Sequence, residues 1–573
     1  MTSTTTLRKN LLLLALAVAA IAAARVTAQP VDASRVTPRD LRPEPSSSGS
    51  AIELPLPPDS PSRAGPEGEP SLSVTIDRVR VQGGFPDMEE TTAALIAPFH
   101  GRRSSTGELS ALADALEAAY SQAGYLFARV TIPPQQVVDG DDFRLQIIDG
   151  YVDSLNLDAI PARQRRVLRS TLKPLIGQKQ LRVAELESAL LVAGDLPGLV
   201  LRSTLVPGEE TGATTLVLEA EHNLLTGNWS TDNRLSQSLG GWQSNLQLQL
   251  NQVLGRGEQF YAYFSGHPNP KRLLYLDDRR RVGGIGVSWP VGRSGMSLNL
   301  EVTASDTFVE TGNPLIPATR SRFRRQSLRL SAPLRMTRAS RITWTGILEH
   351  SEQSNAVPLF QQDLYRDKLR IARMNLSLSR PVLADSTLNL FLQYSQGLDA
   401  GARGVDEVIN SGVPFSRPGS RPDFSRLEFN ASLTSFLPRE FLLISSLRAQ
   451  YAFGQALPTS ELFSMDGEDA LSAMVSGRLS ADAGWTVRSE LSRQFALPAG
   501  PVTVTPFAYI SGGIPQNNAA APEEVLPDHA ASAGLGLRAR GGPLRATLEY
   551  GRSRTGPGDI GGTELFASLQ VVF

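Results

Sequence analysis

The sequence contains no cysteine among its 573 residues. This absence excludes disulfide bonds, thiolate metal sites and cysteine nucleophiles together. It is compatible with a chain that is exported through an oxidising compartment without becoming cross-linked. The formal net charge is only −1, so we expect no overall electrostatic attraction to nucleic acid.

Catalytic patterns are also missing from the sequence. The five histidines are scattered along the chain, at positions 100, 222, 267, 350 and 529. The sequence contains no HExxH zinc motif, P-loop, dinucleotide fingerprint or nucleophile elbow. We therefore predict that the protein is not an enzyme and that it holds no metal and no cofactor.

Long apolar runs are confined to the first residues. Arg8 and Lys9 precede the apolar run 11–24, and Val26-Thr27-Ala28 ends in a small residue, so residues 1–28 read as a signal peptide cleaved after Ala28. The alternative is an uncleaved membrane anchor, but the run of 14 residues is shorter than the ~20 that a spanning helix needs. No later segment approaches 18 consecutive apolar residues. The mature chain is therefore either soluble outside the cytoplasm or crosses a membrane by strands.

Residues 29–221 predict a linker and two similar modules. Residues 29–70 are rich in proline and serine and read as an extended linker. Residues 71–147 predict the order strand, helix, helix, strand, strand, and residues 148–221 repeat that order. A repeat of this kind indicates two tandem copies of one small α+β module. One continuous α+β domain is the alternative.

Residues 222–573 alternate between polar and apolar side chains in sixteen runs. In the run MSLNLEVTAS, for example, Met296, Leu298 and Leu300 share one face, while Asn299 and Glu301 lie on the other. Short connections such as GRGE and LPRE alternate with long ones, which is typical of a transmembrane antiparallel β-barrel of about 16 strands. The alternative is a large soluble β-sandwich. The predicted lumen-facing residues include Gln243, Asn245, Gln247, Arg488 and Glu490.

Two modules followed by such a barrel resemble the two-partner secretion outer-membrane transporters of the haemolysin-activator and filamentous-haemagglutinin-transporter type. The local matches are GYLFARVTIPPQQVVDGDDFRLQIIDGYV (124–152), DLPGLVLRSTLVPGEETGATTLVLEAE (195–221) and STDNRLSQSLGGWQ followed by LGRGEQF. The resemblance implies a Gram-negative outer-membrane protein with two periplasmic POTRA (polypeptide-transport-associated) modules. It also implies a secreted partner exoprotein, usually a β-helical adhesin or cytolysin, which passes through the barrel to the cell surface. An outer-membrane assembly factor and a passive porin-like channel are the alternatives.

An unfolded substrate can be captured by adding a strand to the edge of a module's sheet. The segments LFARVTI (126–132) and LVLRSTLV (199–206) are candidates for such pairing. Ordinary pairing inside the sheet is the alternative for each of them. The predicted substrate-binding residues are Leu126, Ala128, Val130, Leu201, Ser203 and Leu205.

The stretch ELFSMDGEDALSAMVSGRLSADAGW (461–485) interrupts the alternating pattern. The resemblance places it at the extracellular loop that folds into the lumen and carries a Val-Arg-Gly-Tyr-type tip, whose arginine meets an acidic residue on the barrel wall. Here Ser472 occupies the arginine position, so either Arg478 or water is expected to replace that arginine as the partner of Asp482. The alternative is that the loop is merely a plug. The predicted gate-loop residues are Phe463, Gly467, Asp469, Leu471, Ser472, Ala473, Met474, Arg478 and Asp482.

The last run, ELFASLQVVF, ends on Phe573. It resembles the terminal strand that outer-membrane assembly machinery recognises. The expected partners are therefore the secreted exoprotein, the lipid of the outer membrane and this machinery, with no nucleic acid among them.

Overall fold

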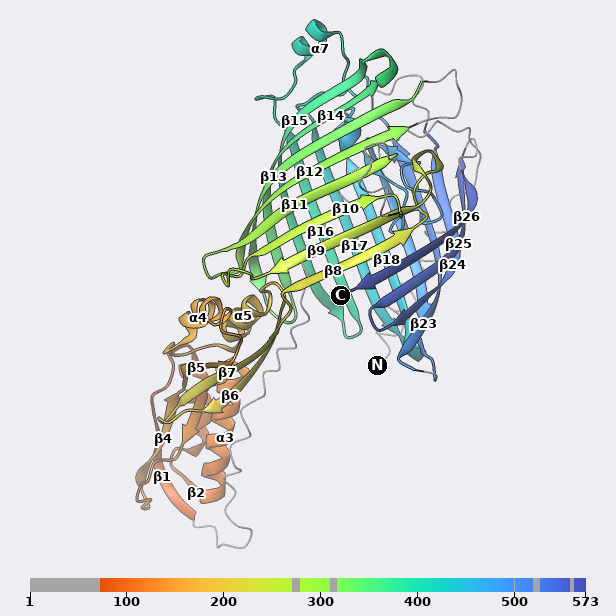
Figure 1. The fold of residues 1–573 in the computed structure, drawn as a ribbon. Helices are drawn as coiled ribbons and strands as arrows, with labels where there is room; N and C mark the ends of the chain where they lie inside the picture. Colours follow the sequence, from red (N-terminus) through yellow and green to blue (C-terminus); the bar gives the residue numbers. More distant parts are fainter. Residues whose placement is uncertain (1–72, 270–278, 310–316, 499, 519–525, 557–560) are drawn as a thin grey trace.

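The computed structural model describes residues 73–269, 279–309, 317–498, 500–518, 526–556 and 561–573. The predicted signal peptide and linker lie outside the described residues. Two small α+β modules stand at one end of a large closed barrel (Figure 1). Within the described ranges, no helix is both long and apolar enough to cross a bilayer.

The first module packs two α-helices against a four-stranded sheet of order β2-β1-β4-β3. Its α3 helix begins with a capping box, in which Ser105 and Glu108 bind each other's backbone N–H groups. Compared with the predicted order, the module has one additional strand, the polar segment β2, at the edge of the sheet. Its elements are β1 (Ser73–Gln82), η3 (Pro86–Met88), α2 (Glu89–Ile96), η4 (Ala97–Phe99), β2 (Arg102–Ser105), α3 (Thr106–Gln122), β3 (Ala128–Thr131) and β4 (Asp141–Asp149).

The second module has a three-stranded sheet of order β5-β7-β6. The strand β7 lies in the centre, parallel to β5 and antiparallel to β6, so β6 is an edge strand. Its elements are β5 (Tyr151–Ala159), α4 (Arg165–Leu172), η5 (Lys173–Leu175), α5 (Val183–Gly194), β6 (Leu199–Pro207) and β7 (Ala213–His222).

The two modules share an interlocked junction. Leu126 and Phe127 follow helix α3 of the first module but pack into the hydrophobic core of the second. Arg182, just before α5, donates to both Asp87 (2.7 Å) and the hydroxyl of Tyr125 (3.0 Å). The hydrogen bond from Tyr125 to Asp87 raises the pKa of the tyrosine. These contacts hold the modules in one relative orientation.

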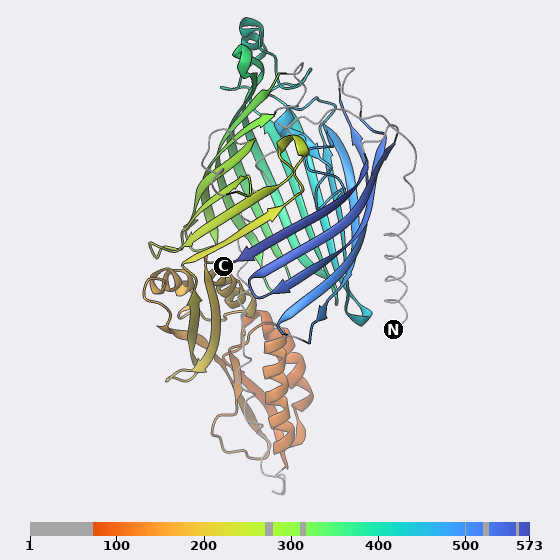
Figure 2. The same cartoon turned by 45° about the vertical axis from the view of Figure 1, so that its right-hand side comes forward.

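The barrel closes through sixteen antiparallel strands, which confirms the predicted fold. The short strand β22 continues β21 after a break at Gln494. The final strand β26 pairs with the first strand β8, and Figure 2 brings this seam to the front. The strands are β8 (Leu225–Asp232), β9 (Gln243–Asn251), β10 (Gln259–Gly266), β11 (Arg280–Val291), β12 (Met296–Val309), β13 (Thr319–Met336), β14 (Arg341–Val357), β15 (Gln362–Leu383), β16 (Ser386–Gly397), β17 (Ser425–Leu437), β18 (Phe441–Tyr451), β21 (Ala483–Arg493), β22 (Phe495–Ala496), β23 (Val502–Gln516), β24 (His529–Gly541), β25 (Leu544–Gly556) and β26 (Gly562–Val572).

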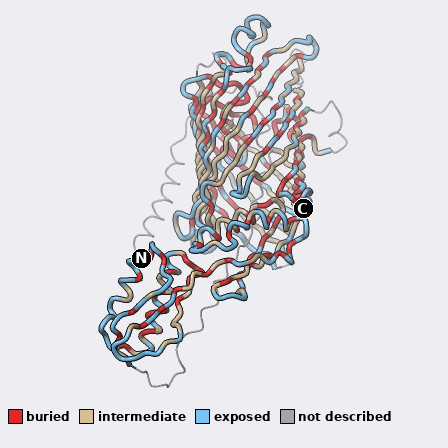
Figure 3. Tube along the Cα trace, turned by 90° about the vertical axis from the view of Figure 1, so that its left-hand side faces the viewer, coloured by how far each residue is buried: buried red, intermediate tan, exposed pale blue. Residues whose placement is uncertain are grey.

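Burial alternates from residue to residue along many barrel strands, as the changing colours of the tube show (Figure 3). Leu300 and Val302 are half exposed on the outer face, whereas Glu301 and Thr303 are buried on the lumenal face. The short turns lie at the end that carries the modules, and the helix α7 (Val405–Ser411) projects from the opposite end (Figure 1). The remaining short elements are η6 (Gln237–Leu239), η7 (Pro358–Phe360), η8 (Pro438–Glu440), η9 (Thr459–Glu461), β19 (Phe463–Ser464) and β20 (Ser480–Ala481).

The second module docks against the short turns of the barrel. Gln252, after β9, donates to the backbone oxygen of Pro197 (2.7 Å). Arg341, at the start of β14, pairs with Asp195 (2.9 Å), and this contact joins the end of α5 to the wall. The module is therefore fixed beside the end of the barrel that bears the short turns.

Candidate functional site

The connection between β18 and β21, residues 452–482, turns into the barrel; we call it the lumenal loop. At its tip Leu471, Ser472, Ala473 and Met474 are each at most 1% exposed. The tip contacts lumenal positions of several strands, because Ala473 lies against Ser532 of β24 and packs where Gly551 of β25 has no side chain. The predicted tip is thus enclosed by the barrel wall.

The lumenal loop is folded within itself. Strands β19 and β20 pair as a small hairpin, and an apolar cluster that includes Phe463, Met465 and Leu479 packs beneath them. The carboxylate of Asp466 accepts hydrogen bonds from the backbone N–H groups of Arg478 (2.5 Å) and Leu479 (2.6 Å). Gly467 has a φ of 95°, a left-handed conformation that favours glycine. The loop is therefore a folded unit with its own hairpin, apolar cluster and hydrogen bonds.

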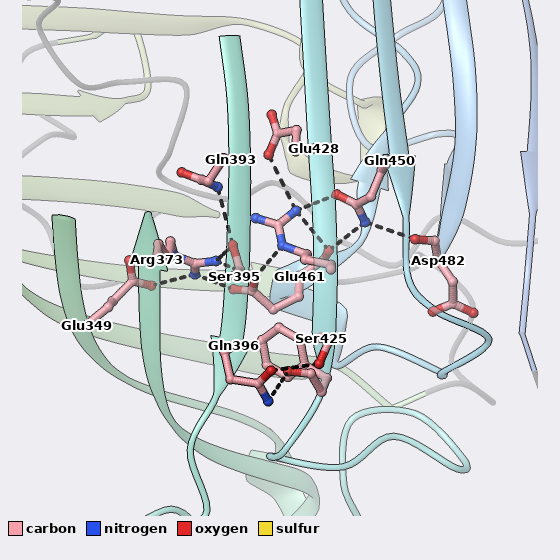
Figure 4. Close-up of polar contacts among 12 residues, drawn as sticks. Glu349, Arg373, Gln393, Ser395, Gln396, Ser425, Glu428, Gln450, Glu461 and Asp482 are labelled. Atoms are coloured by element: carbon pink, nitrogen blue, oxygen red, sulfur yellow. Dashed lines mark hydrogen bonds and ion pairs between the residues drawn. The ribbon is translucent and has the colours of Figure 1, made fainter. Parts of the chain in front are cut away.

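A single side chain holds both ends of this loop. Gln450 of β18 donates to the backbone oxygens of Glu461 (3.1 Å) and Asp482 (2.9 Å), as Figure 4 shows. Its amide oxygen accepts a hydrogen bond from Arg426 of β17. Because Gln450 is 4% exposed, these bonds are largely shielded from water. We call this closed base of the loop the neck.

Glu461 anchors the first side of the neck to the wall. Its carboxylate accepts two hydrogen bonds from Arg373 of β15, at 2.9 and 2.8 Å, and pairs with Arg426 at 3.0 Å. Arg373 also contacts Glu349 of β14 (Figure 4). All four side chains are at most 6% exposed. Removal of one partner would leave a buried charge without compensation.

Asp482 anchors the other side of the neck, but to a different part of the protein than predicted. Its two carboxylate oxygens pair with Arg417, at 2.5 and 3.2 Å. They also accept the backbone N–H groups of Leu457 and Asn518. The expected partner, Arg478, instead lies 3.7 Å from Glu564 of β26. The prediction of an Arg478–Asp482 pair was wrong, because the loop between β16 and β17 (398–424) brings Arg417 to the buried carboxylate.

Two arginines from outside the loop hold the tip, one on a wall strand and one in the connection between β8 and β9. Arg488 of β21 donates to the hydroxyl of Ser472 (2.7 Å), and Arg234 donates to the backbone oxygen of the same residue (3.0 Å). Each arginine also pairs with a buried carboxylate, Arg488 with Glu490 and Arg234 with Glu549. The positive charges at this contact therefore belong to residues outside the loop. The tip supplies only uncharged acceptors, the hydroxyl and the backbone oxygen of Ser472.

The other predicted residues fall in several places. Arg488 and Glu490 reach the tip region, as described above. Gln243, Asn245 and Gln247 lie on the face of β9 opposite to the outward Leu246 and Leu250, and they bind neighbouring polar groups such as Asp232, Ser230 and Asn228. Asp469 of the lumenal loop is exposed.

The predicted substrate-binding side chains are all buried in the modules. Leu126, Ala128, Val130, Leu201, Ser203 and Leu205 are between 0% and 8% exposed. These side chains belong to the cores of the modules, so only the predicted pairing through the backbone applies to these segments. Ala128 and Val130 lie on β3, and Leu201, Ser203 and Leu205 lie on β6; both are edge strands, and Leu126 precedes β3. Pairing through their backbone therefore stays a prediction.

Sequence reasoning missed several residues that hold the loop. No local motif connects these residues, which come from five separate segments: Arg234, Arg417, Arg426, Gln450 and Glu461. Alternation could have placed Arg426 and Gln450 on the lumenal face, since each lies in a strand. Nothing in the spacing of the sequence could have paired them with the loop.

Comparison with known proteins gives the family. The model for "Haemolysin secretion/activation protein ShlB/FhaC/HecB" matches residues 212–539, which is more than half of the chain. The chain belongs to this family. A second model, for a ShlB-type POTRA domain, matches residues 74–150.

Named relatives are distant in sequence. The hemolysin transporter protein ShlB of Serratia marcescens is 23% identical over 417 residues, covering 70% of this chain and 69% of the relative. The heme/hemopexin transporter protein HuxB of Haemophilus influenzae is 20% identical, covering 73% and 72%. The solved structure of CdiB from Escherichia coli has a TM-score of 0.71 at 21% identity, covering 90% of this chain and 94% of that one.

Membership of the ShlB/FhaC/HecB family places the barrel in the bacterial outer membrane with its POTRA modules in the periplasm. The protein is a two-partner secretion transporter, which moves a secreted partner protein across that membrane. The short turns of the barrel are accordingly periplasmic, and the loop that carries α7 is extracellular.

Proposed function

We propose that the second module captures the unfolded partner on strand β6, and that the lumenal loop must leave its closed position before the partner passes. The partner is an exported protein of the β-helical adhesin or cytolysin type, as the resemblance implies. The observation that carries the proposal is the closed neck, where Glu461 and Asp482 bind separate arginines and share Gln450. Breaking these buried ion pairs costs free energy, so the neck holds the loop in its closed position.

The structure favours β6 over β3 as the capture strand. At the outer edge of β3, the backbone N–H of Val130 already donates to Glu117 of helix α3 (3.0 Å). The same carboxylate pairs with Arg129 (3.2 Å). A substrate strand would have to displace this carboxylate from the edge of β3, which makes β3 a poor docking edge.

The pairing of β6 with β7 determines which backbone groups of β6 point outward. Asn223 donates to Gly198 at one end of the pair, and Gly208 donates to Ala213 at the other. In antiparallel pairs the hydrogen-bonded positions alternate, so the even-numbered residues of β6 bind β7. The backbone groups of Leu201 and Leu205 therefore face away from β7, where an added strand would pair.

The absence of native cysteine allows a direct test of capture. Thr204→Cys, on an exposed position of β6, can carry a photoactivatable label as the single thiol of the chain. We expect cross-links to the secreted partner exoprotein when both proteins are expressed together. Asp153→Cys, exposed on the opposite edge strand β5, is the matched control. Equal or stronger cross-linking from Asp153→Cys would overturn the assignment of β6.

A pair of introduced cysteines tests whether the lumenal loop must move. The backbone nitrogen of Ala473 lies 3.5 Å from the hydroxyl of Ser532, so Ala473→Cys with Ser532→Cys places two thiols side by side. We expect surface display of the partner to fall when this disulfide forms and to recover after reduction, whereas each single variant secretes normally. Undiminished secretion through the cross-linked barrel would overturn the proposal that the loop must leave its closed position.

The terminal strand is the proposed contact of the outer-membrane assembly machinery. Phe573 exchanges two backbone hydrogen bonds with Gly227, at 2.8 and 3.0 Å, and its side chain is half exposed. A side chain at position 227 would collide with the ring of Phe573. Phe573→Ala should therefore lower the amount of assembled barrel, measured by its heat-dependent mobility on gels.

A further inference from the structure

The outer faces of β13, β14 and β15 change character abruptly along their length. In the half nearer the periplasm, the outward residues are apolar and exposed: Leu328 and Leu334 of β13, Leu348 of β14, and Met374 and Leu376 of β15. In the half nearer the cell surface, the outward positions hold mainly arginine, lysine and other polar residues.

The change occurs at the same register on all three strands. The last apolar row is Leu328, Leu348 and Ala372, which are direct neighbours across the strands. The next outward rows are Gln326 with His350 and Arg370, Arg324 with Glu352 and Lys368, and Arg322 with Ser354 and Arg366. Five of these nine positions carry a permanent positive charge and only Glu352 a negative one. We call Arg322, Arg324, Arg366, Lys368 and Arg370 the outer cationic patch.

Most of this charge is not neutralised within the protein. Among the described residues, no carboxylate oxygen lies within 4.0 Å of a side-chain nitrogen of Arg322, Arg324, Lys368 or Arg370. Asp363 pairs with Arg366 of the patch (2.5 Å), so Arg366 is compensated. Glu352, the cross-strand neighbour of Arg324 and Lys368, contacts His350 (3.5 Å), and Asp306, the cross-strand neighbour of Arg322, pairs with Arg281 and Arg320. The exposed guanidinium groups can therefore bind an external anion.

The position of the patch relative to the bilayer identifies the anion. On β15 the outward residues between Arg380 and Arg370 are Leu378, Leu376, Met374 and Ala372, an apolar span of nine residues. A tilted strand crosses the hydrocarbon core in about 9–11 residues, so Arg370 lies where the core ends. Because Arg380 lies toward the short periplasmic turns, Arg370 and its neighbours are at the headgroup level of the outer leaflet.

We propose that the outer cationic patch binds the phosphate groups of a phosphorylated glycolipid in the outer leaflet. Guanidinium groups present paired donors that match phosphate oxygens, and neighbouring strands space them within reach of one headgroup. The patch is continuous with the lipid-facing band and points away from the lumen. These features favour a lipid over the exported polypeptide as its ligand.

The test measures lipid binding by the full-length protein. Bis-phosphorylated lipid A is titrated onto the purified transporter in detergent and counted by native mass spectrometry, with fully dephosphorylated lipid A as the second probe. We expect Arg324→Ser with Lys368→Ser and Arg370→Ser to weaken binding of the phosphorylated lipid at least about tenfold. Arg324→Lys with Arg370→Lys, which keeps the charge, should retain most of the binding.

The matched control removes three exposed arginines from the periplasmic ends of the strands, Arg380, Arg540 and Arg545, each changed to serine. It should bind lipid A like the unchanged protein. The proposal is overturned if the triple patch variant, with its barrel intact on gels, binds lipid A normally, or if dephosphorylated lipid A binds equally well. Loss of secretion with unchanged lipid binding would also overturn it, by assigning the charges to the exported chain.

Discussion

Arg417 and Asp482 form a buried bidentate ion pair although they lie on different extracellular connections. The arginine belongs to the loop between β16 and β17, and the aspartate ends the lumenal loop. The arginine side chain is 5% exposed and the aspartate side chain is fully buried. This ion pair therefore links an extracellular loop directly to the segment that fills the lumen, beside the hydrogen bond from Thr459 to Ser416.

Arg417→Ala should release the lumenal loop. The variant leaves Asp482 buried with only backbone donors, and breaking a buried pair in this way costs roughly 3–5 kcal/mol. We expect larger and more frequent openings in planar lipid bilayers. Arg421→Ala is the matched control, because Arg421 and Asp423 form an exposed pair in the same loop worth about 0–1 kcal/mol. Conductance equal in the two variants would argue against this link.

Glu461→Gln should weaken the opposite side of the neck. The change removes the charge that faces both Arg373 and Arg426, and leaves two buried cations with less compensation. We expect the barrel to unfold at a lower temperature, measured by the loss of its folded mobility on gels. Glu428→Gln, which alters a partly exposed contact to Arg426 at 3.6 Å, should have a smaller effect. The reverse order of the two variants would contradict this assignment.

Ser472→Arg should impair closure rather than improve it, even though relatives are expected to carry arginine at this position. The new cation would enter a fully buried position between Arg488 and Arg234. The new positive charge would repel those of the two arginines and destabilise the closed position of the loop. We therefore expect increased conductance. The double variant Ser472→Arg with Arg488→Ser removes one of the two cations and should return conductance toward that of the unchanged protein. If the single variant closes normally, the tip is not held as described.

Protonation of Glu108 should loosen the first POTRA module at low pH. The backbone N–H of Ser105 holds the pKa of Glu108 below its usual range. A carboxyl group whose pKa is lowered by folding stabilises the folded state above its unfolded pKa, and the stabilisation disappears as the pH falls through the folded pKa. Glu108→Gln should therefore increase amide hydrogen exchange at the start of α3 at neutral pH.

The difference between Glu108→Gln and the unchanged protein should shrink below about pH 4.3, the ordinary pKa of glutamate. Hydrogen exchange of the full-length protein in detergent measures both conditions. A difference that stays constant down to pH 3 would exclude a role of the charged carboxylate. Helix α5 of the second module serves as the internal reference, since its exchange should not respond to the substitution.

The sequence predicts the local features of this fold well and the distant contacts poorly. The alternation through Met296 and Val302 assigns lumenal and lipid faces, because the period of a strand is a local property. The strand β2 escaped prediction because Arg102–Ser105 is short, polar and at an edge, so no hydrophobic pattern marks it. The Arg417–Asp482 pair joins residues 65 positions apart, and its identity depends on how two loops fold over one another.

The neck has a consequence for variation in length. Gln450 joins Glu461 to Asp482 directly, so the chain between them forms a side excursion whose two ends meet at one fixed point. Residues can be inserted or deleted inside that excursion without shifting β18 against β21, whose pairing runs to Gln450 and Gly484. The length of the loop can thus change without a change in the pairing of the two strands, whereas the residue at the tip must match the charges of Arg488 and Arg234 that hold it.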